Sequence, residues 1–238
     1  MLRIYHPYPL QLGQSIRLDK AAAHHVSRVL RAKLNDTIHL FDGLGSEVQA
    51  IIQQIDKHDV KLLIEQDKIA KTESTFAIHL GQALLHREKM DWVIQKSVEL
   101  GVTSITPIIT ERSQPRLSEE RYTKRQQHWQ NIIINACEQC GRAKLPELHA
   151  PCDFSVWVEQ YQGILCDPIA NTTIKQLKQS DVAGRILIGS EGGLSNEEIE
   201  YAKSQDWQTI QLGTRILRTE TAAIAIIAIL QAQFGDIG

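Results

Sequence analysis

Residues 185–195 read Arg-Ile-Leu-Ile-Gly-Ser-Glu-Gly-Gly-Leu-Ser, and no other stretch says more about the fold. The apolar first half is typical of a buried strand, the glycines indicate a turn, and Ser195 with Glu198 forms a capping box for a following helix. Glycines let a ligand approach the backbone and free N–H groups to bind it. Neither Gly-x-Gly-x-x-Gly nor a P-loop Lys-Ser/Thr is present. The stretch therefore indicates a nucleotide-like ligand, although a plain strand-to-helix turn needs the same cap.

A second stretch of this kind, Leu212–Ala222 (LGTRILRTETA), also follows an expected strand and opens an expected helix. Arg215, Arg218 and Glu220 would crowd one strand end. Ligands of open parallel sheets lie beyond the carboxyl ends of the strands, so we expect the two loops to converge on one site. For Glu220, a structural role at the positive end of the helix is about as consistent with the sequence as a catalytic one.

From residue 76 onward, strands and helices alternate. The expected strands are Phe76–Gly81, Ser104–Ile109, Gly163–Asp167, Arg185–Gly189 and Thr209–Leu212, and the expected helices are Glu88–Leu100, Glu119–Cys140, Thr172–Ser180, Asn196–Ser204 and Thr219–Phe234. This alternation predicts an α/β fold with a parallel sheet covered by helices on both faces.

The N-terminal part reads as mostly strand, with one helix that Asp19 can cap. The expected strands are Asp36–Phe41, Val48–Ile55 and Val60–Ile64, and the expected apolar stripe of the helix is Ala23, Val26, Val29 and Leu30. Short strands around one helix predict a small β-barrel. The polar stretch Asp67–Thr75 marks the boundary, so we expect one domain at 1–71 and another at 74–238.

The composition is that of an ordinary globular protein, with 42% hydrophobic and 23% charged residues among 238. A formal net charge of −2 argues against a broad cationic surface, so any contacts to RNA must come from local patches. The longest apolar run, Ala222–Leu230, is too short to span a bilayer, and we expect no secretory leader. We expect the four cysteines to be reduced thiols of a cytoplasmic protein.

Two basic clusters are candidates for phosphate contacts, although each residue taken singly is better explained as a solvated charge. The first comprises His24, His25, Arg28, Arg31 and Lys33 on the N-terminal helix, with positions 24, 28 and 31 on one face; the second includes Arg112 and Arg116.

The long helix ends in Asn135–Arg142 (NACEQCGR). A zinc site would normally need a second pair of ligands, and a redox Cys-x-x-Cys would normally open a helix rather than end one. We therefore interpret Cys137 and Cys140 as small buried thiols and expect no metal. Gly141 is typical of a helix stop, which places Glu138 and Arg142 where they could reach RNA or a target base.

Two other helices carry weaker indications. Packing is the first explanation of the helix 88–100, so Lys89 and Glu99 are only weak functional candidates. The helix 219–234 is apolar around most of its surface and must be buried nearly all round. A dimer interface would supply that burial, and so would a central position in a monomer.

Together these segments resemble one family, the bacterial 16S ribosomal RNA uracil-N3 methyltransferases of the RsmE type in the SPOUT superfamily. The resemblance covers nearly the whole chain. It rests on His25-Val26 with Val29-Leu30-Arg31, Leu40–Gly43, Lys89–Asp91, Lys96–Gly101, Glu138–Arg142, Ile188–Gly193 and Leu212–Ala222. Ser190 stands where the family often has proline, which should loosen the turn without removing an N–H donor.

The resemblance implies a PUA-like RNA-binding domain at the N-terminus and a deep trefoil knot in the C-terminal domain, a rare exception to the rule against threaded chains. It also implies a bent S-adenosylmethionine in the knotted loops and a homodimer whose active site takes residues from both subunits. The target would be a single uridine of 16S ribosomal RNA in an assembled small subunit.

The resemblance and the chemistry of uracil N3 together assign the site residues. S-adenosylmethionine would contact Leu165, Asp167, Pro168, Ile188, Gly189, Glu191, Gly192, Gly193, Leu212, Gly213, Ile216, Leu217 and Thr221. Arg218 or Arg142 would stabilise a uracil anion, and Glu220 or Glu138 would be the general base or an orienting carboxylate.

Two other classes of protein remain as alternatives. A dinucleotide-dependent oxidoreductase would need an acidic residue after the following strand to hold a ribose, and the glycine spacing does not match its fingerprint. A non-enzymatic RNA-binding protein would leave the glycine turn and the arginine-rich loop without a purpose.

Overall fold

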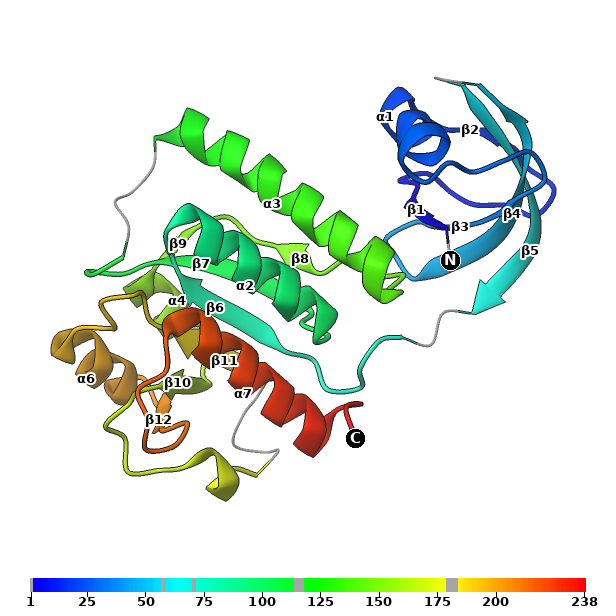
Figure 1. Ribbon diagram of the computed structural model, residues 1–238. Helices are drawn as coiled ribbons and strands as arrows, with labels where there is room; N and C mark the ends of the chain where they lie inside the picture. Colours follow the sequence, from blue (N-terminus) through cyan, green and yellow to red (C-terminus); the bar gives the residue numbers. More distant parts are fainter. Residues whose placement is uncertain (1, 57–58, 70–71, 114–117, 179–183) are drawn as a thin grey trace. The chain divides into compact units, whose positions relative to one another are not determined.

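The computed structural model describes residues 2–56, 59–69, 72–113, 118–178 and 184–238 (Figure 1). The chain forms two compact units. Unit 1 consists of Met1–Glu73 with Cys137–Leu145, and unit 2 consists of Ser74–Ala136 with Pro146–Gly238. The sequence predicts a single boundary between residues 71 and 74. In the structure, the segment 137–145 also belongs to unit 1.

Unit 1 contains a five-stranded sheet in the order β1-β3-β4-β5-β2. Its strands are β1 Arg3–Tyr5, β2 Ser15–Arg17, β3 Thr37–Phe41, β4 Ser46–Ile55 and β5 Val60–Ile69. β1 pairs with β3 in parallel, and the other pairs are antiparallel. The expected strands Val48–Ile55 and Val60–Ile64 correspond to the antiparallel pair β4–β5, and residues 57–58 between them lie outside the described residues. The sequence did not predict β1 and β2, which have only three residues each.

The N-terminal helix of unit 1 confirms the predicted cap and corrects the predicted stripe. Asp19 accepts a hydrogen bond from Ala22 N at 2.8 Å and caps α1 (Lys20–His24). The helix then continues as a π-helical turn, η1 (His25–Val29). A π-turn holds more residues than an α-turn, so Val29 falls off the buried stripe and is 60% exposed. Arg31 lies beyond the helix end with φ +52°, so the predicted common face of positions 24, 28 and 31 was wrong.

A network of charged side chains around the buried Glu47 joins four strands of unit 1 to the segment 137–145. Arg3 donates to Glu47 Oε2 at 3.0 Å and to the carbonyl oxygens of Cys137 and Arg142 at 2.6 and 3.0 Å. Lys68 Nζ and His39 Nδ1 lie 2.9 and 3.1 Å from Glu47 Oε1. Burial alone would raise the pKa of Glu47, but the hydrogen bonds from Lys68 and Arg3 hold it below its usual value.

Unit 2 contains a seven-stranded sheet in the order β12-β10-β11-β6-β7-β8, with β9 also paired to β7. All pairs between these strands are parallel, which confirms the predicted fold class. The strands are β6 His79–Ala83, β7 Ser104–Ile109, β8 Glu147–Leu148, β9 Cys152–Asp153, β10 Ile164–Cys166, β11 Arg185–Ile188 and β12 Gln208–Ile210. Because the strands are parallel, the loops after β10, β11 and β12 leave the sheet at the same edge.

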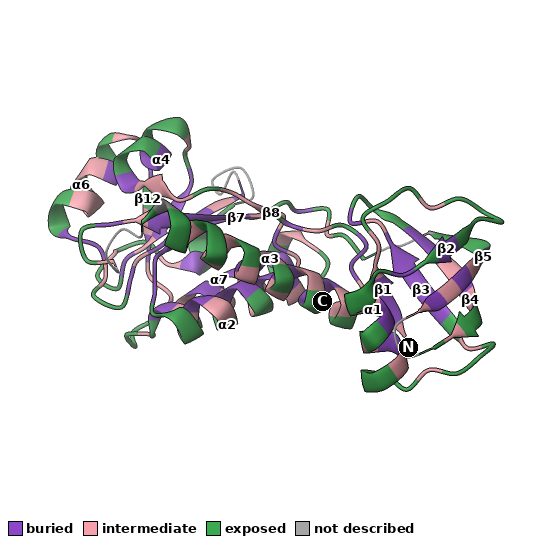
Figure 2. Ribbon diagram, turned by 90° about the horizontal axis from the view of Figure 1, so that it is seen from above, coloured by how far each residue is buried: buried purple, intermediate pink, exposed green. Residues whose placement is uncertain are grey.

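Helices cover both faces of this sheet, as predicted. Figure 2 shows α4 and α6 on one side, and α2 and α7 on the other. The helices are α2 Arg87–Glu99, α3 Glu119–Cys140, α4 Phe154–Gln160, η2 Ile174–Gln176, α6 Asn196–Ser204 and α7 Thr219–Phe234. In the part of the chain that the structure describes, no helix is long and apolar enough to cross a membrane.

In unit 2, one predicted helix is much shorter in the structure and one helix was not predicted. The expected helix 172–180 is only the short 3-10 turn η2 in its described part, because Leu177 is already extended at ψ 137°. The seven-residue helix α4 was missed, although its Phe154, Trp157 and Val158 are buried. They pack with Leu187 and Trp207 in a core between the sheet and the helices α4 and α6.

Candidate active site

A cavity of about 590 Å³ lies in unit 2 beyond the carboxyl ends of β10, β11 and β12. Residues 166–169, 188–194 and 210–220 supply most of its wall, and Lys89 of α2 contributes from another helix. The two loops singled out in the sequence therefore meet at one site, as predicted. This position is the usual one for the ligands of parallel sheets.

Most of the predicted contact residues line this cavity: Asp167, Pro168, Ile188, Gly189, Glu191, Gly193, Leu212, Gly213, Ile216, Leu217, Arg218 and Glu220. Three others are placed elsewhere. Leu165 is fully buried in the core of the sheet, and Gly192 and Thr221 are exposed residues outside the described lining.

The glycine loop after β11 is held in one conformation by its own hydrogen bonds. Gly193 has φ +71° and donates from its N–H to the Ser190 carbonyl oxygen at 3.0 Å. A Cβ atom at Gly189 would come within 3.1 Å of the backbone of Gly193 and Leu194. The turn therefore needs glycine at both positions. Ser195 and Glu198 form the predicted capping box of α6.

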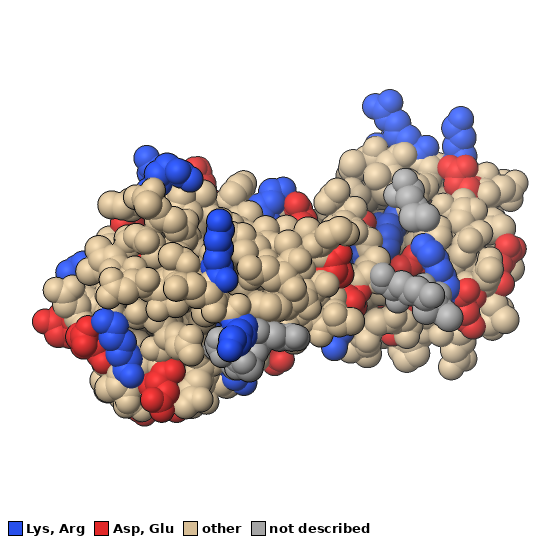
Figure 3. Space-filling view, turned by 90° about the horizontal axis from the view of Figure 1, so that it is seen from below, with Lys and Arg blue, Asp and Glu red and all other residues tan. Residues whose placement is uncertain are grey.

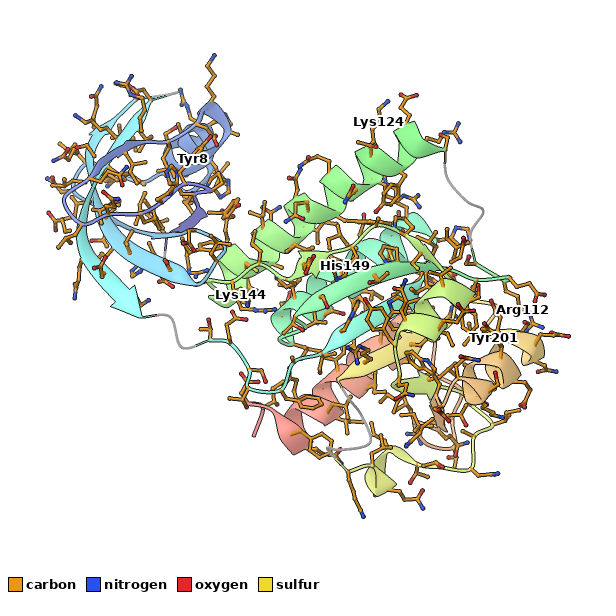
Figure 4. All side chains as sticks on the ribbon, turned by 180° about the vertical axis from the view of Figure 1, so that it is seen from behind. Tyr8, Arg112, Lys124, Lys144, His149 and Tyr201 are labelled. Carbon is orange, nitrogen blue, oxygen red and sulfur yellow. The ribbon has the colours of Figure 1, made fainter. Side chains whose placement is uncertain are left out.

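Arg112, which is predicted to bind RNA, is exposed and also holds the glycine loop from outside. Its Nη1 atom donates to the carbonyl oxygens of Gly192 and Leu194, both at 3.3 Å. The backbone oxygen of Arg112 also accepts a hydrogen bond from Ser190 Oγ at 2.7 Å. Figure 4 shows the Arg112 side chain beside α6, which follows this loop. Arg116, the other member of this cluster, lies outside the described residues.

Gln82, which the sequence did not single out, ties the two loops together. It lies in β6 opposite Ile188 of β11, and it is 0% exposed. Its Nε2 atom donates to the Gly189 carbonyl oxygen at 3.3 Å and to Thr219 Oγ1 at 3.2 Å. Thr219 Oγ1 in turn donates to the same Gly189 oxygen at 2.6 Å. One buried set of hydrogen bonds therefore links Gly189, at the start of the glycine loop, to Thr219, at the start of α7.

The second loop presents flexible and charged side chains to the cavity. Gly213 has φ +104°, and Ile216 is 84% exposed although it lines the cavity. Arg215 and Arg218 are exposed and have no ion-pair partner in the described part of the chain. Glu220 lies in the first turn of α7, where the helix N-terminus favours an acidic group.

Three charged side chains meet in the cavity wall. Lys89 Nζ lies 3.6 Å from Glu191 Oε1 and 3.7 Å from Glu220 Oε2. Glu191 Oε1 also accepts a hydrogen bond from His86 N at 3.1 Å. Burial acts to raise the pKa of Glu191, but this hydrogen bond and the charge of Lys89 hold it below its usual value.

Glu138 and Arg142 belong to unit 1 and have partners there. Arg142 is 3% exposed and donates from Nε and Nη2 to the carboxylate of Glu73 at 3.2 and 2.6 Å. Glu138 Oε1 accepts from Tyr5 N at 3.0 Å, and burial raises the pKa of Glu138. Gly141 ends α3 with φ +92°, as predicted. These contacts give both side chains a structural role inside unit 1.

The other predicted RNA-binding residues lie at the surface of unit 1. Arg28, Arg31 and Lys33 are exposed, and His25 is half-buried. All four cysteines are free, and Cys137 and Cys140 hydrogen-bond to one another. Within the described ranges, no three ligating side chains gather as a metal site would require.

Comparison with known proteins identifies the family. A family model described as an RNA methyltransferase domain matches residues 72–231, and one described as an RNA methyltransferase PUA domain matches residues 18–65.

Curated relatives and a solved structure agree with this match. The ribosomal RNA small subunit methyltransferase E of Buchnera aphidicola subsp. Schizaphis graminum is 41% identical over 99% of this chain and 97% of its own. That of Rickettsia conorii is 32% identical over 92% and 91%. A crystal structure of the Neisseria gonorrhoeae enzyme of this name, bound to S-adenosyl methionine, is 33% identical, covers both chains fully and has a TM-score of 0.93. The predicted resemblance is thus confirmed, and the chain belongs to the RNA methyltransferase family that includes the ribosomal RNA small subunit methyltransferases E, with an N-terminal PUA-type domain.

Proposed function

We propose that this protein transfers a methyl group from S-adenosylmethionine to N3 of one uridine in 16S ribosomal RNA of the small subunit. The observation that carries the proposal is the single cavity formed where the two glycine-bearing loops converge at the carboxyl edge of the sheet. The Neisseria relative, which was solved with S-adenosyl methionine bound, shares this fold over its whole length. Because ribosomal RNA would be its substrate, we also propose that this protein acts in the cytoplasm.

The chemistry of the cavity suits this methyl donor. A volume of about 590 Å³ is within the usual range of sites for small molecules. Ile188, Leu212 and Leu217 offer an apolar wall for an adenine ring, and Glu191 offers carboxylate oxygens for hydroxyl or ammonium groups. Gly189 and Gly193 keep the wall next to the backbone free of side chains.

The residues of the cavity can supply what N3 of uracil lacks. N3 carries a proton at neutral pH and lies on the pairing edge, so the base must be unpaired before it can react. Glu220 is the residue we assign to accept that proton, and Arg218 is the cation we assign to stabilise the resulting anion. When bound, S-adenosylmethionine supplies an electrophilic methyl group on a sulfonium centre. We do not assign Glu138 or Arg142 a role in the reaction, because Glu138 is hydrogen-bonded to Tyr5 and Arg142 to Glu73.

We also propose that unit 1 binds the RNA through local basic residues. On the face shown in Figure 3, Lys and Arg side chains are scattered singly among acidic ones, without a broad cationic area. Arg28, Arg31 and Lys33 are exposed near one another along the sequence, beside the exposed Val29 and Leu34. This combination suits a limited contact to a few phosphates better than nonspecific binding along a duplex.

A homodimer is the third part of the proposal. In the single chain, α7 leaves Ala222, Ile224, Ala225, Ala228 and Ile229 only half-buried (Figure 2). Half-exposed apolar residues along one helix are typical of a surface that a second copy covers. The expected sharing of an active site between subunits rests on this interface.

Mass spectrometry of nucleosides tests the proposed reaction. Small ribosomal subunits that lack the modification are incubated with the purified protein and labelled S-adenosylmethionine. We expect one 3-methyluridine per subunit, and loss of about 100-fold or more in rate for Glu220→Gln and Arg218→Ala. Lys203→Ala, a change at an exposed residue of α6, should leave the rate unchanged. A methyl group on another atom would reject the assignment to N3, and the absence of any methyl group would leave an RNA-binding protein.

A further inference from the structure

Lys89 occupies an unusual place for a lysine. It lies in the first turn of α2 (Arg87–Glu99), at the positively polarised end of the helix, where a cation is unfavourable. Its side chain is only 30% exposed and lines the cavity. The stability of α2 therefore does not explain a lysine at this position. The groups around its side chain must explain it.

Those surroundings are one carboxylate from each of the two loops. Lys89 Nζ lies 3.6 Å from Glu191 on the glycine loop and 3.7 Å from Glu220 at the start of α7. The Glu191 oxygen is already held by the backbone N–H of His86, which precedes α2. Lys89 is thus anchored next to a fixed carboxylate, and its charge reaches the second one.

Glu220 Oε2 is a buried oxygen that accepts no hydrogen bond from any described residue. At 3.7 Å, Lys89 compensates its charge without donating a hydrogen bond to it. A desolvated carboxylate oxygen without a donor is costly in a folded protein, and such exceptions occur at functional sites. Oε2 therefore keeps a lone pair that a donor entering the cavity can use.

We propose that Lys89 is a positioning residue, which holds the Glu220 side chain in the cavity wall with its Oε2 atom free to accept the proton of the substrate. This inference rests on the function proposed above and assigns a role to a residue outside both loops. In that step the N–H bond of the substrate breaks, its electron pair stays on nitrogen, and the proton moves to Glu220 Oε2. The protonated Glu220 later returns the proton to water.

The chain offers a matched control on the same helix. Lys96 is 35% exposed and pairs with Glu99 at 2.8 Å, so it resembles Lys89 in exposure and in having a carboxylate partner. Lys96 does not line the cavity in the described structure. Any effect of Lys89→Met that Lys96→Met reproduces would come from the helix rather than from the site.

Single-turnover methyl transfer to small ribosomal subunits tests the proposal. Lys89→Met should lower the rate at least tenfold, with the Kd for S-adenosylmethionine and the KM for RNA within about threefold of wild type. Lys89→Arg keeps a cation and should restore most of the rate, and Lys96→Met should match wild type. In a Glu220→Gln background, Lys89→Met should have little further effect, because Lys89 acts through Glu220.

Three results would overturn the proposal. These are a wild-type rate for Lys89→Met, the same loss in the Glu220→Gln background as in wild type, or a loss explained by weaker cofactor binding alone. If Lys89→Met does not fold, which its thermal midpoint reports, Lys89→Gln replaces it. Should the wild-type protein itself make no 3-methyluridine, the proposed function fails, whereas these three results appear only when wild type is active.

Discussion

Gln82 is a buried side chain that links the two loops of the cavity. Its amide donates to Gly189 O and Thr219 Oγ1, and these two atoms belong to the two loops that form the cavity. The distance between the loops therefore depends on a residue of β6 that does not line the cavity.

Replacing Gln82 by Met keeps the side-chain volume and removes the donors. We expect a free energy of unfolding lower by about 1–3 kcal/mol, because the amide leaves buried acceptors with fewer donors. The Kd for S-adenosylmethionine, measured by calorimetry, should rise about threefold to tenfold. Gln95→Met changes an exposed glutamine of α2 and should alter neither quantity. Unchanged cofactor binding in Gln82→Met would mean that the hydrogen bonds from Gln82 to the two loops do not determine the shape of the cavity.

His79 is a residue whose ionisation should affect stability. Burial, with the charges of His149 and Arg185, lowers its pKa to about 4, and its Nε2 atom lies 2.7 Å from Thr106 Oγ1. The unfolded chain would bind a proton at this residue below about pH 6.5, and the folded chain only near pH 4. Stability should therefore fall as the pH is lowered from about 6.5 to 4.

The variant His79→Gln isolates this effect. Between pH 7.5 and 5, urea unfolding of wild type should lose on the order of 1–2 kcal/mol more than the variant, after allowance for screening of a partly exposed ring. His24→Gln, at an exposed histidine, should keep the wild-type dependence on pH. Equal losses in wild type and His79→Gln would show that His79 is not responsible.

Sequence alone identified the residues whose type serves the backbone. Gly189, Gly193 and Gly213 were predicted because glycine is needed where a turn is tight or φ is positive. Gln82 was missed because a single polar residue in an apolar segment forms no pattern, and Lys89 was rated weak because packing was the first explanation of its helix. Their partners lie on distant segments, and only the folded chain brings them together.

At the scale of elements, local chemistry predicted the helix ends well. Asp19, Ser195 and Gly141 mark helix ends where the sequence placed them. The π-turn η1 was not predictable in this way, because it changes the helical period without a distinctive residue. β8 and β9 have two residues each, too few for any periodicity.

The helix α7 carries the prediction that belongs to this scale. Ile229→Glu places a charge on its half-buried apolar side and should weaken a dimer at least tenfold, because an apolar contact is lost and a charge is desolvated. Sedimentation equilibrium measures this dissociation constant. Gln233→Glu, at an exposed site of the same helix, should not change it. A wild-type protein that remains monomeric at high concentration would reject the dimer.

At the scale of the whole molecule, the main feature that could not be predicted from the sequence is that the segment 137–145 belongs to unit 1. It depends on Arg3, which binds carbonyl oxygens more than 130 positions away in the chain. Pairing over such separations leaves no local pattern. The trefoil knot remains a prediction from the resemblance.

Arg3→Met tests the coupling of this segment to unit 1. Removing one partner of a buried charge network should cost about 3 kcal/mol and speed amide exchange in β1 and β3. Arg17→Met breaks the exposed pair with Asp59 and should cost less than about 1 kcal/mol. Hydrogen exchange with mass spectrometry resolves the units, and tryptophan fluorescence reports unit 2, which holds all four tryptophans. Equal effects of the two variants would contradict the role of Arg3.

The central claim is that the loops 188–194 and 210–220 form one pocket for a sulfonium methyl donor. Calorimetric titration of the purified protein with S-adenosylmethionine tests it directly, alongside Leu212→Trp, which fills the cavity, and Gln162→Trp, an exposed position outside it. We expect saturable binding of one donor per chain, retained in Gln162→Trp and lost in Leu212→Trp. Absence of binding by wild type at saturating concentration, or unchanged binding by Leu212→Trp, would contradict it.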